Sequence, residues 1–261
     1  MTGRDEYYNK AKQKGYRARS AFKLTQLDDR AGLLDRGDTV VDLGAAPGGW
    51  MQVTAERVGR EGTVVGVDRQ RIDDLEDPEA TVEYVRGDIT EERTRDEIRE
   101  TVGGGERPVD VVVSDMAPNM TGDYDLDHAR SVHLVRQAFD VAEELLASGG
   151  DFVAKVFDGR DLDDLEADID EEFEYVRQMR PDASRDESSE LYLVARNRLT
   201  APVRAGDELA VEIVDTGSEG DGIARVEDFT VFVPGAQEGE TVPVEIEDVK
   251  PRFAFAAVRE D

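Results

Sequence analysis

The sequence contains no cysteine. This absence excludes disulfide bonds, thiolate metal ligands, iron–sulfur clusters and cysteine nucleophiles. Histidine is nearly absent as well, since only His128 and His133 occur. Their spacing of five does not place them on one face of a helix, where residues three or four apart meet. We therefore expect no metal site.

Long apolar runs are also missing. No stretch approaches the ~20 apolar residues that span a bilayer, and no N-terminal segment has the basic and apolar parts of a signal peptide. We expect a cytoplasmic, monomeric protein without membrane contact. Its 261 residues suffice for one full core with a second small domain beside it.

Lysine is scarce and acidic residues are abundant. Asp and Glu number 61 against 32 Lys and Arg, and the formal net charge is -29. This composition resembles that of proteins from salt-loving archaea. Most of the acidic residues are expected to form a solvated surface, and such a charge ordinarily disfavours a polyanionic partner.

The basic residues are concentrated near the N-terminus. Between residues 4 and 23 there are seven of them against two acidic ones. We therefore predict that this basic arm guides the phosphates of a nucleic-acid partner toward the functional site of the protein, the alternative being a solvated helix face. The residues proposed for this role are Lys10, Lys12, Lys14, Arg17 and Arg19.

Short β-branched runs alternate with helical patterns over most of the chain, which predicts an α/β fold with a doubly wound, Rossmann-like sheet of seven strands. Phe173–Met179 and Glu190–Arg196 are joined without helical periodicity, so we expect them to form an antiparallel pair at the sheet edge. A helix is expected over Leu126–Ala147, ended by two glycines. The other expected strands are Thr39–Leu43, Thr63–Asp68, Val82–Arg86, Val109–Asp115 and Asp151–Phe157.

The pattern changes after Arg198. Val203–Val258 shows strand-like alternation broken by glycine and proline, with no helix-length period. Many short strands separated by glycine predict a small β-barrel. We place the boundary near residue 199, between a catalytic domain of residues 1–198 and a barrel of residues 199–261.

A glycine-rich turn follows the first predicted strand. Val41–Trp50 (VDLGAAPGGW) joins a strand to a helix, which is where an open α/β sheet binds a nucleotide-like ligand. Asp68 ends the second strand, where it can accept hydrogen bonds from a ribose diol, and Asp88 follows the third, where it can meet an adenine amine. The glycines do not match G-x-G-x-x-G, so NAD is the weaker interpretation. A plain tight turn is the alternative.

Three more polar residues stand at strand ends or within strands. Asp115 ends the fourth strand, Lys155 lies in the apolar fifth and Glu190 begins the seventh. Each can be structural, since a strand lysine often snorkels and an Asp often caps a turn. Group transfer to a hydroxyl, however, needs one aligned hydroxyl and one group that handles its proton. Lys155 held between the two carboxylates would meet that need, with Lys23 as a second ammonium.

These residues lie within stretches that resemble the FtsJ/RrmJ (RlmE) family of 23S ribosomal RNA uridine 2′-O-methyltransferases. The likeness covers about residues 6–198. The matching stretches are Arg19–Leu24, Val41–Trp50, Ser114–Met120, Val153–Phe157 and Ser189–Ala195.

The resemblance implies S-adenosyl-L-methionine as cofactor and large-subunit ribosomal RNA, or a pre-ribosomal particle, as partner. The Lys-Asp-Lys-Glu tetrad of the family falls on Lys23, Asp115, Lys155 and Glu190. Its cofactor contacts fall on Gly48, Trp50, Asp68, Asp88 and Asp115. A 2′-O-methyltransferase of transfer RNA and a non-catalytic, RNA-binding ribosome-assembly factor are the alternatives. The complete tetrad speaks against the latter.

The C-terminal region resembles a TRAM domain in Gly220–Ala224, Phe232–Ala236 and Val249–Ala256. The resemblance implies an RNA-binding barrel, in which Phe253 and Phe255 are candidates for base stacking. A barrel without a ligand is the alternative. TRAM domains also accompany uracil-C5 methyltransferases and methylthiotransferases, but the absence of cysteine excludes both.

Overall fold

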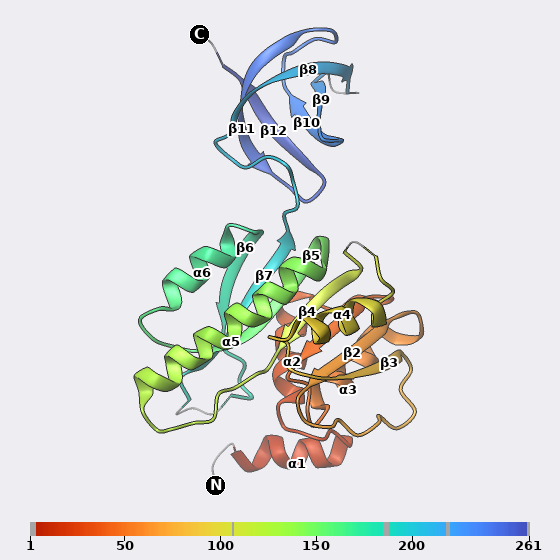
Figure 1. Ribbon diagram of the computed structural model, residues 1–261, viewed down its shortest axis with the longest axis vertical. Coiled ribbons are helices and arrows are strands. Elements are labelled where there is room, and N and C mark those ends of the chain that lie inside the picture. Colours follow the sequence, from red (N-terminus) through yellow and green to blue (C-terminus); the bar gives the residue numbers. More distant parts are fainter. Residues whose placement is uncertain (1–3, 106, 185–187, 218–219, 260–261) are drawn as a thin grey trace.

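The protein consists of an α/β domain followed by a β-barrel (Figure 1). The computed structural model describes residues 4–105, 107–184, 188–217 and 220–259. Within these residues, no helix is both long enough and apolar enough to cross a bilayer.

The α/β domain is built on a seven-stranded sheet with the order β3-β2-β1-β4-β5-β7-β6. Its first five strands are parallel, and β7 lies antiparallel to both β5 and β6. The predicted doubly wound sheet and its antiparallel pair at the edge are confirmed. The strands are β1 (Thr39–Leu43), β2 (Thr63–Asp68), β3 (Thr81–Arg86), β4 (Val109–Ser114), β5 (Leu146–Phe157), β6 (Phe173–Met179) and β7 (Glu190–Arg198).

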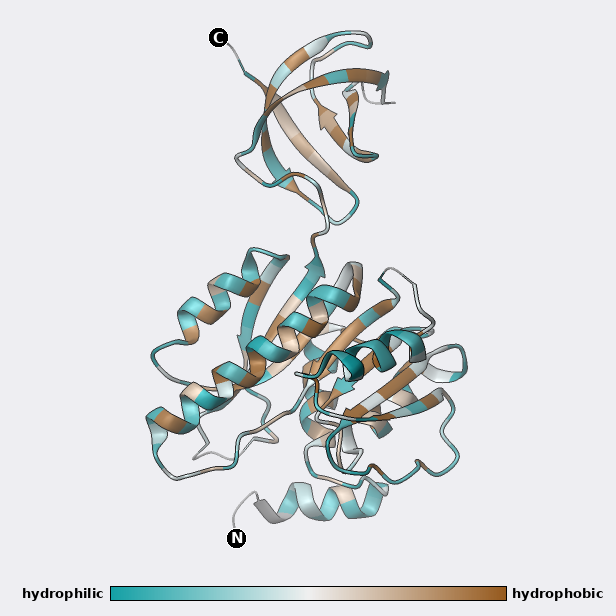
Figure 2. Ribbon diagram, viewed as in Figure 1, coloured by the Kyte–Doolittle hydropathy of each residue, from teal (hydrophilic) through white to brown (hydrophobic). Residues whose placement is uncertain are grey.

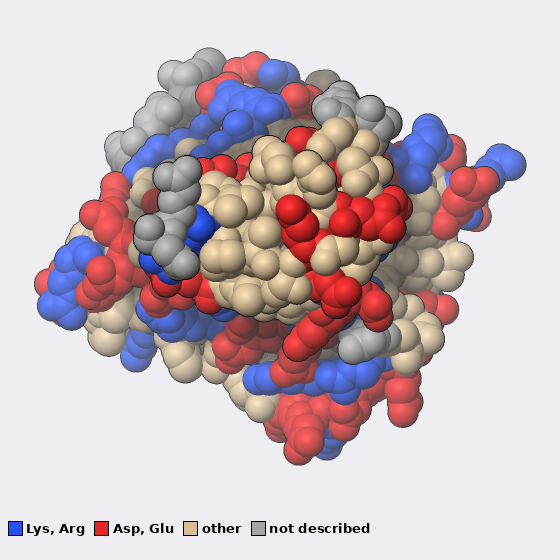
Figure 3. Space-filling model, turned by 90° about the horizontal axis from the view of Figure 1, so that it is seen from above, with Lys and Arg blue, Asp and Glu red and all other residues tan. Residues whose placement is uncertain are grey.

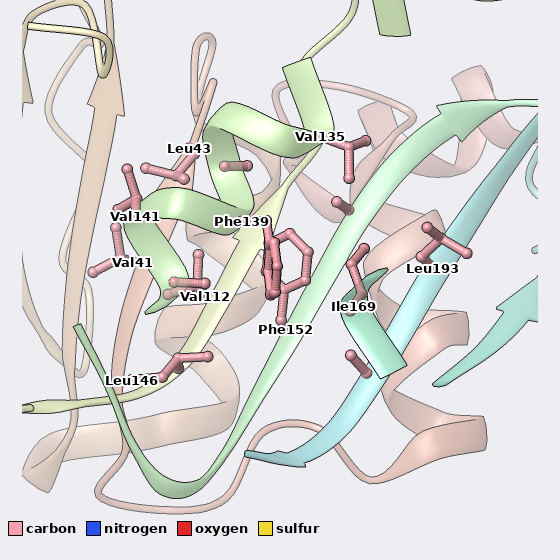
Figure 4. Close-up of a cluster of buried hydrophobic side chains, with 14 of the residues drawn as sticks. Val41, Leu43, Val112, Val135, Phe139, Val141, Leu146, Phe152, Ile169 and Leu193 are labelled. Atoms are coloured by element: carbon pink, nitrogen blue, oxygen red, sulfur yellow. The ribbon is translucent and has the colours of Figure 1, made fainter. Parts of the chain in front are cut away.

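Helices cover both faces of this sheet because its strands carry apolar residues on both sides. Val41 and Leu43 of β1 pack toward α4, α5 and α6, whereas Val40 packs toward α2 and α3. Figure 4 shows the first of these two clusters, and the strands are the most hydrophobic part of the domain in Figure 2. The helices are α1 (Arg4–Lys14), α2 (Ala21–Ala31), α3 (Gly49–Val58), η1 (Gly59–Glu61), α4 (Glu92–Thr101), α5 (Tyr124–Leu145) and α6 (Leu162–Asp170).

The junction between α5 and β5 differs from the prediction. The helix ends at Leu145 and the strand begins directly at Leu146, before the glycine pair that was expected to end the helix. Leu146 is fully buried and pairs with Val109 of β4. Pairing across the sheet therefore extends β5 backward over a segment that carries no local strand signal.

The barrel is closed by five strands in the order β10-β12-β11-β8-β9, as predicted from the C-terminal pattern. It has an apolar core of its own, to which alternate residues such as Val211 and Ile213 contribute. The strands are β8 (Glu208–Thr216), β9 (Gly222–Val226), β10 (Phe229–Val233), β11 (Thr241–Val249) and β12 (Phe253–Val258).

The barrel lies at the end of the sheet opposite the carboxyl ends of the parallel strands (Figure 1). This follows from β7, which runs antiparallel to β5 and leads from Glu190, opposite Phe157, directly toward the barrel. Polar contacts, among them two to strands of the sheet, join the barrel to the α/β domain. The Ser148 hydroxyl donates to the Pro251 carbonyl at 2.5 Å, and Lys250 Nζ lies 2.8 Å from a Glu174 carboxylate oxygen.

Candidate active site

The four predicted tetrad residues form two buried ion pairs. Lys155 Nζ donates to the Asp115 backbone carbonyl at 2.5 Å and to its Oδ1 at 2.9 Å. Lys23 Nζ lies 2.5 Å from Glu190 Oε1, and each side chain of that pair is only 11 % exposed. The two pairs come from the ends of β4 and β7, the interior of β5 and the first turn of α2.

This pairing differs from the expectation that Lys155 lies between both carboxylates. The partner of Glu190 is Lys23, together with the Ser184 hydroxyl at 2.9 Å. The reason is the register of β5 and β7, which sets Lys155 opposite Tyr192 and Glu190 opposite Phe157. Helix α2 then supplies the ammonium for Glu190.

Tyr192 joins the two ion pairs. It is fully buried, and its hydroxyl donates to Asp115 Oδ1 at 2.8 Å, the same oxygen that Lys155 contacts. Lys23 Nζ lies 5.9 Å from the centre of its ring. Burial, reinforced by the charges of Asp115 and Glu190, raises the pKa of the Tyr192 phenol well above its usual range. The phenol is therefore a neutral hydrogen-bond donor.

Sequence reasoning missed Tyr192 because an aromatic residue in an apolar strand is ordinarily part of the core. The available signal was its hydroxyl, since a buried tyrosine needs a partner for it.

An open cleft of about 1050 Å³ lies beside Asp115, at the carboxyl ends of β2, β3 and β4. Asp68 and Asp88 line it together with Gly44, at which an added Cβ would lie 2.5 Å from the Met116 side chain. The cleft has the size of a site for a nucleoside-sized ligand. Three carboxylates on one wall give it strong hydrogen-bond acceptors.

The carboxylates of the cleft are oriented by backbone groups. Asp68 accepts hydrogen bonds from the amides of Ala46 at 3.0 Å and Gln70 at 2.7 Å, so it also holds the glycine-rich turn. Asp88 accepts from the amide and hydroxyl of Thr90, and these bonds lower the pKa of its carboxyl. Within the described residues, no group of three or more His, Asp and Glu could hold a metal ion.

Gly48 and Trp50, the other two predicted cofactor contacts, are not among the described residues that line this cleft. Trp50 is buried, its indole N–H donates to the Ser20 carbonyl at 2.8 Å, and its ring packs 5.7 Å from that of Tyr192. Gly48 has φ 103° and precedes α3. In this structure Trp50 supports Tyr192, and Gly48 shapes the turn.

Asp42 is a second residue that the sequence analysis did not single out. It lies in β1, is fully buried, and neither of its carboxyl oxygens has a hydrogen-bond partner. Burial, with the nearby charges of Asp115 and Asp68, raises the pKa of this carboxyl well above its usual range. Asp42 therefore stands as a neutral acid near the carboxylates of the cleft. The sequence signal that could have identified Asp42 is a single Asp next to the valines of a strand expected to be buried.

The basic arm divides into two parts. Lys10, Lys12 and Lys14 lie on α1 and are exposed, and Lys10 pairs with Glu6 at 2.6 Å. Arg17, by contrast, donates to the carbonyls of Pro47, Asp73 and Asp74, and Arg19 donates to the Ala183 carbonyl at 2.6 Å. The guanidinium groups of both arginines thus hold neighbouring loops, and their role in guiding phosphates stays a prediction.

Comparison with known proteins agrees with this geometry. The model of the FtsJ-like methyltransferase family matches residues 16–198, and that of the TRAM domain matches residues 202–258. A crystal structure of a Plasmodium falciparum chain described as a ribosomal RNA methyltransferase superposes with a TM-score of 0.62 at 26 % identity, covering 70 % of this chain and 98 % of that one.

Two archaeal relatives match over nearly their whole length, and both carry the name "Ribosomal RNA large subunit methyltransferase E". The protein from Haloarcula marismortui is 74 % identical over 98 % of both chains. That from Natronomonas pharaonis is 63 % identical over 100 % of both. The expected likeness to salt-loving archaea is thus confirmed. The chain belongs to the FtsJ-like methyltransferase family.

Proposed function

We propose that this protein transfers a methyl group from S-adenosyl-L-methionine to the 2′-hydroxyl of a uridine in large-subunit ribosomal RNA. One observation carries the proposal: two largely buried ion pairs, Lys155–Asp115 and Lys23–Glu190, lie beside a cleft of the size of a nucleoside. The names of the close relatives support ribosomal RNA as the substrate.

The carboxylates of the cleft fit S-adenosyl-L-methionine, which supplies an electrophilic methyl group on a sulfonium. Asp68 would accept hydrogen bonds from the ribose hydroxyls, and Asp88 would accept one from the adenine amine. Asp115 lines the same cleft and also belongs to the ion pair with Lys155, and it would orient the methionine end. Acceptors of this kind suit a cationic ligand that carries several donors.

The two lysines then act on the ribose hydroxyl. As the methyl group is transferred, the hydroxyl proton must leave, and negative charge develops on its oxygen. Lys155 either takes the proton as a neutral amine, or stabilises this charge as the ammonium paired with Asp115 while the proton leaves to solvent; Lys23 adds an ammonium in both cases. Because Asp115 and Tyr192 hold Lys155, its position is set before substrate binds, which reduces the reorganisation needed in the reaction.

Two surfaces are proposed to bind the RNA. One is α1, with the exposed Lys10, Lys12 and Lys14. The other is the aromatic patch of the barrel, which we define as Phe232, Phe253 and Phe255. Their ring centroids lie 5.4 to 5.8 Å apart, and Phe255 is 38 % exposed. In the view onto this end of the molecule, acidic groups border a largely uncharged surface (Figure 3), so base stacking suits the patch better than phosphate contact.

These roles imply a division of the chain near residue 199, between a catalytic domain of residues 1–198 and a barrel domain of residues 199–261. The end of β7 at Arg198 and the limits of the two family matches support this division.

The test is transfer of a tritiated methyl group to large ribosomal subunits from a strain that lacks the gene, at high potassium chloride. We expect incorporation at one uridine ribose, mapped by resistance to alkaline hydrolysis. Transfer to tRNA instead of the subunit would favour the tRNA alternative. Tight subunit binding without any transfer would identify an assembly factor.

A further inference from the structure

Three large apolar side chains are exposed within one short segment that follows β4. Met120 is 64 % exposed, Tyr124 56 % and Leu126 42 %. Elsewhere in the described residues such side chains are exposed mostly singly. On a chain with a net charge of -29, this apolar cluster is a marked exception.

The segment is held rigidly. The Asp127 carboxylate accepts hydrogen bonds from the Thr121 amide and hydroxyl, both at 2.9 Å, and from the Gly122 amide at 3.0 Å. The Tyr124 hydroxyl donates to the Asp158 carbonyl at 2.6 Å. With its hydroxyl anchored and more than half of its side chain exposed, Tyr124 offers an ordered aromatic surface at little entropic cost.

The segment also lies next to the proposed active site. Asp158 follows β5 three residues after Lys155, and its amide donates to the Ser189 carbonyl, beside Glu190, at 2.8 Å. On the other side, Met116–Asn119 precede the cluster and line the cleft that adjoins Asp115. Tyr124 and Met120 therefore stand on the rim from which a ribose would approach the two ion pairs.

We propose that Tyr124 and Met120 form a platform for one unstacked RNA base next to the methylated nucleotide. This inference rests on the proposed function, because it places the target ribose at Lys155. Proteins that recognise single-stranded RNA stack its splayed bases on aromatic side chains. The exposed Asp123 and Asp125 beside the platform repel phosphates. The platform therefore contacts the face of a base and not the backbone.

The experiment uses the full chain and an rRNA fragment that contains the target uridine. Tyr124→Ala should raise KM for this fragment roughly tenfold, the loss expected for one stacked base, with kcat and S-adenosylmethionine affinity unchanged. Tyr124→Phe keeps the ring and loses only the anchoring hydroxyl, so its KM should stay much closer to the parental value than that of Tyr124→Ala. Tyr175→Ala is the matched control, since Tyr175 is 41 % exposed on β6, and it should change nothing.

Fragments with an abasic ribose at single positions identify the base. The parent should bind the fragment more weakly when one nucleotide next to the target is abasic. Tyr124→Ala should bind that abasic fragment and the intact fragment with equal affinity. Equal KM for Tyr124→Ala and the parent overturns the platform, as does Tyr124→Phe behaving like Tyr124→Ala. If Tyr124→Ala raises KM for whole subunits but not for naked RNA, the platform is overturned as well, and Tyr124 contacts a ribosomal protein instead of an RNA base. If the parent itself methylates no RNA, the proposed function fails instead.

Discussion

The α/β domain and the barrel differ in whether they bury charged side chains. In the described residues, the α/β domain buries Asp42, Asp151, Lys155, Glu190 and Arg198, whereas the residues buried inside the barrel are apolar. Burying a charge is costly unless it is paired and hydrogen-bonded. The α/β domain bears part of this cost at the site of the proposed chemistry, where Asp42, Lys155 and Glu190 lie. The barrel bears none, so any function it has must lie on its outer surface.

This contrast separates two kinds of defect. Changes at the charged residues of the proposed active site should lower the rate or the cofactor affinity. Changes at the surface of the barrel or of α1 should weaken RNA binding and leave the methyl transfer step intact.

The largest effect is expected for Lys155→Ala. Because Lys155 would act in the transition state, kcat should fall by about 10²–10⁴-fold. S-adenosylmethionine affinity, measured by calorimetry, should stay within about twofold. Lys250→Ala is the control, since Lys250 lies between the sheet and the barrel, and it should leave single-turnover rates unchanged. Residual activity within tenfold of the parent would refute the catalytic role.

Asp68→Ala should act on the cofactor. It removes an acceptor from the cleft wall and the carboxylate that holds the Ala46 amide. We expect the dissociation constant for S-adenosylmethionine to rise on the order of ten- to a hundredfold, the equivalent of one charge-assisted hydrogen bond. Asp73→Ala, at an exposed position, should change nothing. Calorimetry that returns the same affinity for Asp68→Ala and the parent would show that Asp68 has another role.

Replacing Lys10, Lys12 and Lys14 together with Gln should weaken RNA binding at low salt by on the order of tenfold. The slope of log affinity against log salt should flatten by about 0.7–0.9 per lost phosphate contact, hence by about two to three units if each of the three lysines makes one contact. Filter binding over a potassium chloride series measures both. An unchanged slope would mean that α1 is a solvated helix face and that RNA docks elsewhere.

Phe255→Ala tests the outer surface of the barrel. Losing one stacking ring should weaken RNA binding by about fivefold, near the lower end of the range for base–aromatic stacking, with the single-turnover rate of bound RNA unchanged. Val258→Ala changes another exposed apolar residue of β12 and serves as the control. If both variants bind RNA like the parent, the barrel is a structural appendage.

The smallest effect concerns the cavity between the two domains, which Asp38 and Asp151 line with Lys250 and Pro251. Burial raises the pKa of each of these carboxyls to about 6. At pH 5, Asp38 is therefore mostly protonated in the folded protein and mostly ionised in the unfolded chain. The contribution of Asp38 to the free energy of unfolding falls as the pH rises toward and through 6. The free energy of unfolding of Asp38→Asn, measured with urea and taken relative to that of the parent, should therefore be higher at pH 8 than at pH 5. The same difference at both pH values would contradict the raised pKa.

Much of the molecule was predictable from local pattern. Apolar runs of strand length, separated by helical periods, predicted the sheet, because strands joined by helices pair in parallel and are covered by those helices on both faces. Alternating residues between glycines predicted the barrel. The α5–β5 junction escaped prediction because the pairing of Leu146 with Val109 depends on a strand distant in sequence.

What the sequence by itself determined is therefore the fold class, the barrel and the set of residues that gather at one end of the sheet, since chain order and strand polarity are enough for that. Only the tertiary structure decided their partners. The register of β5 and β7 places Tyr192, and not Glu190, opposite Lys155. The packing of α2 brings Lys23 into contact with Glu190. It also turned Arg17 toward three carbonyl groups. Such pairings depend on distances across the fold, which no local sequence pattern encodes.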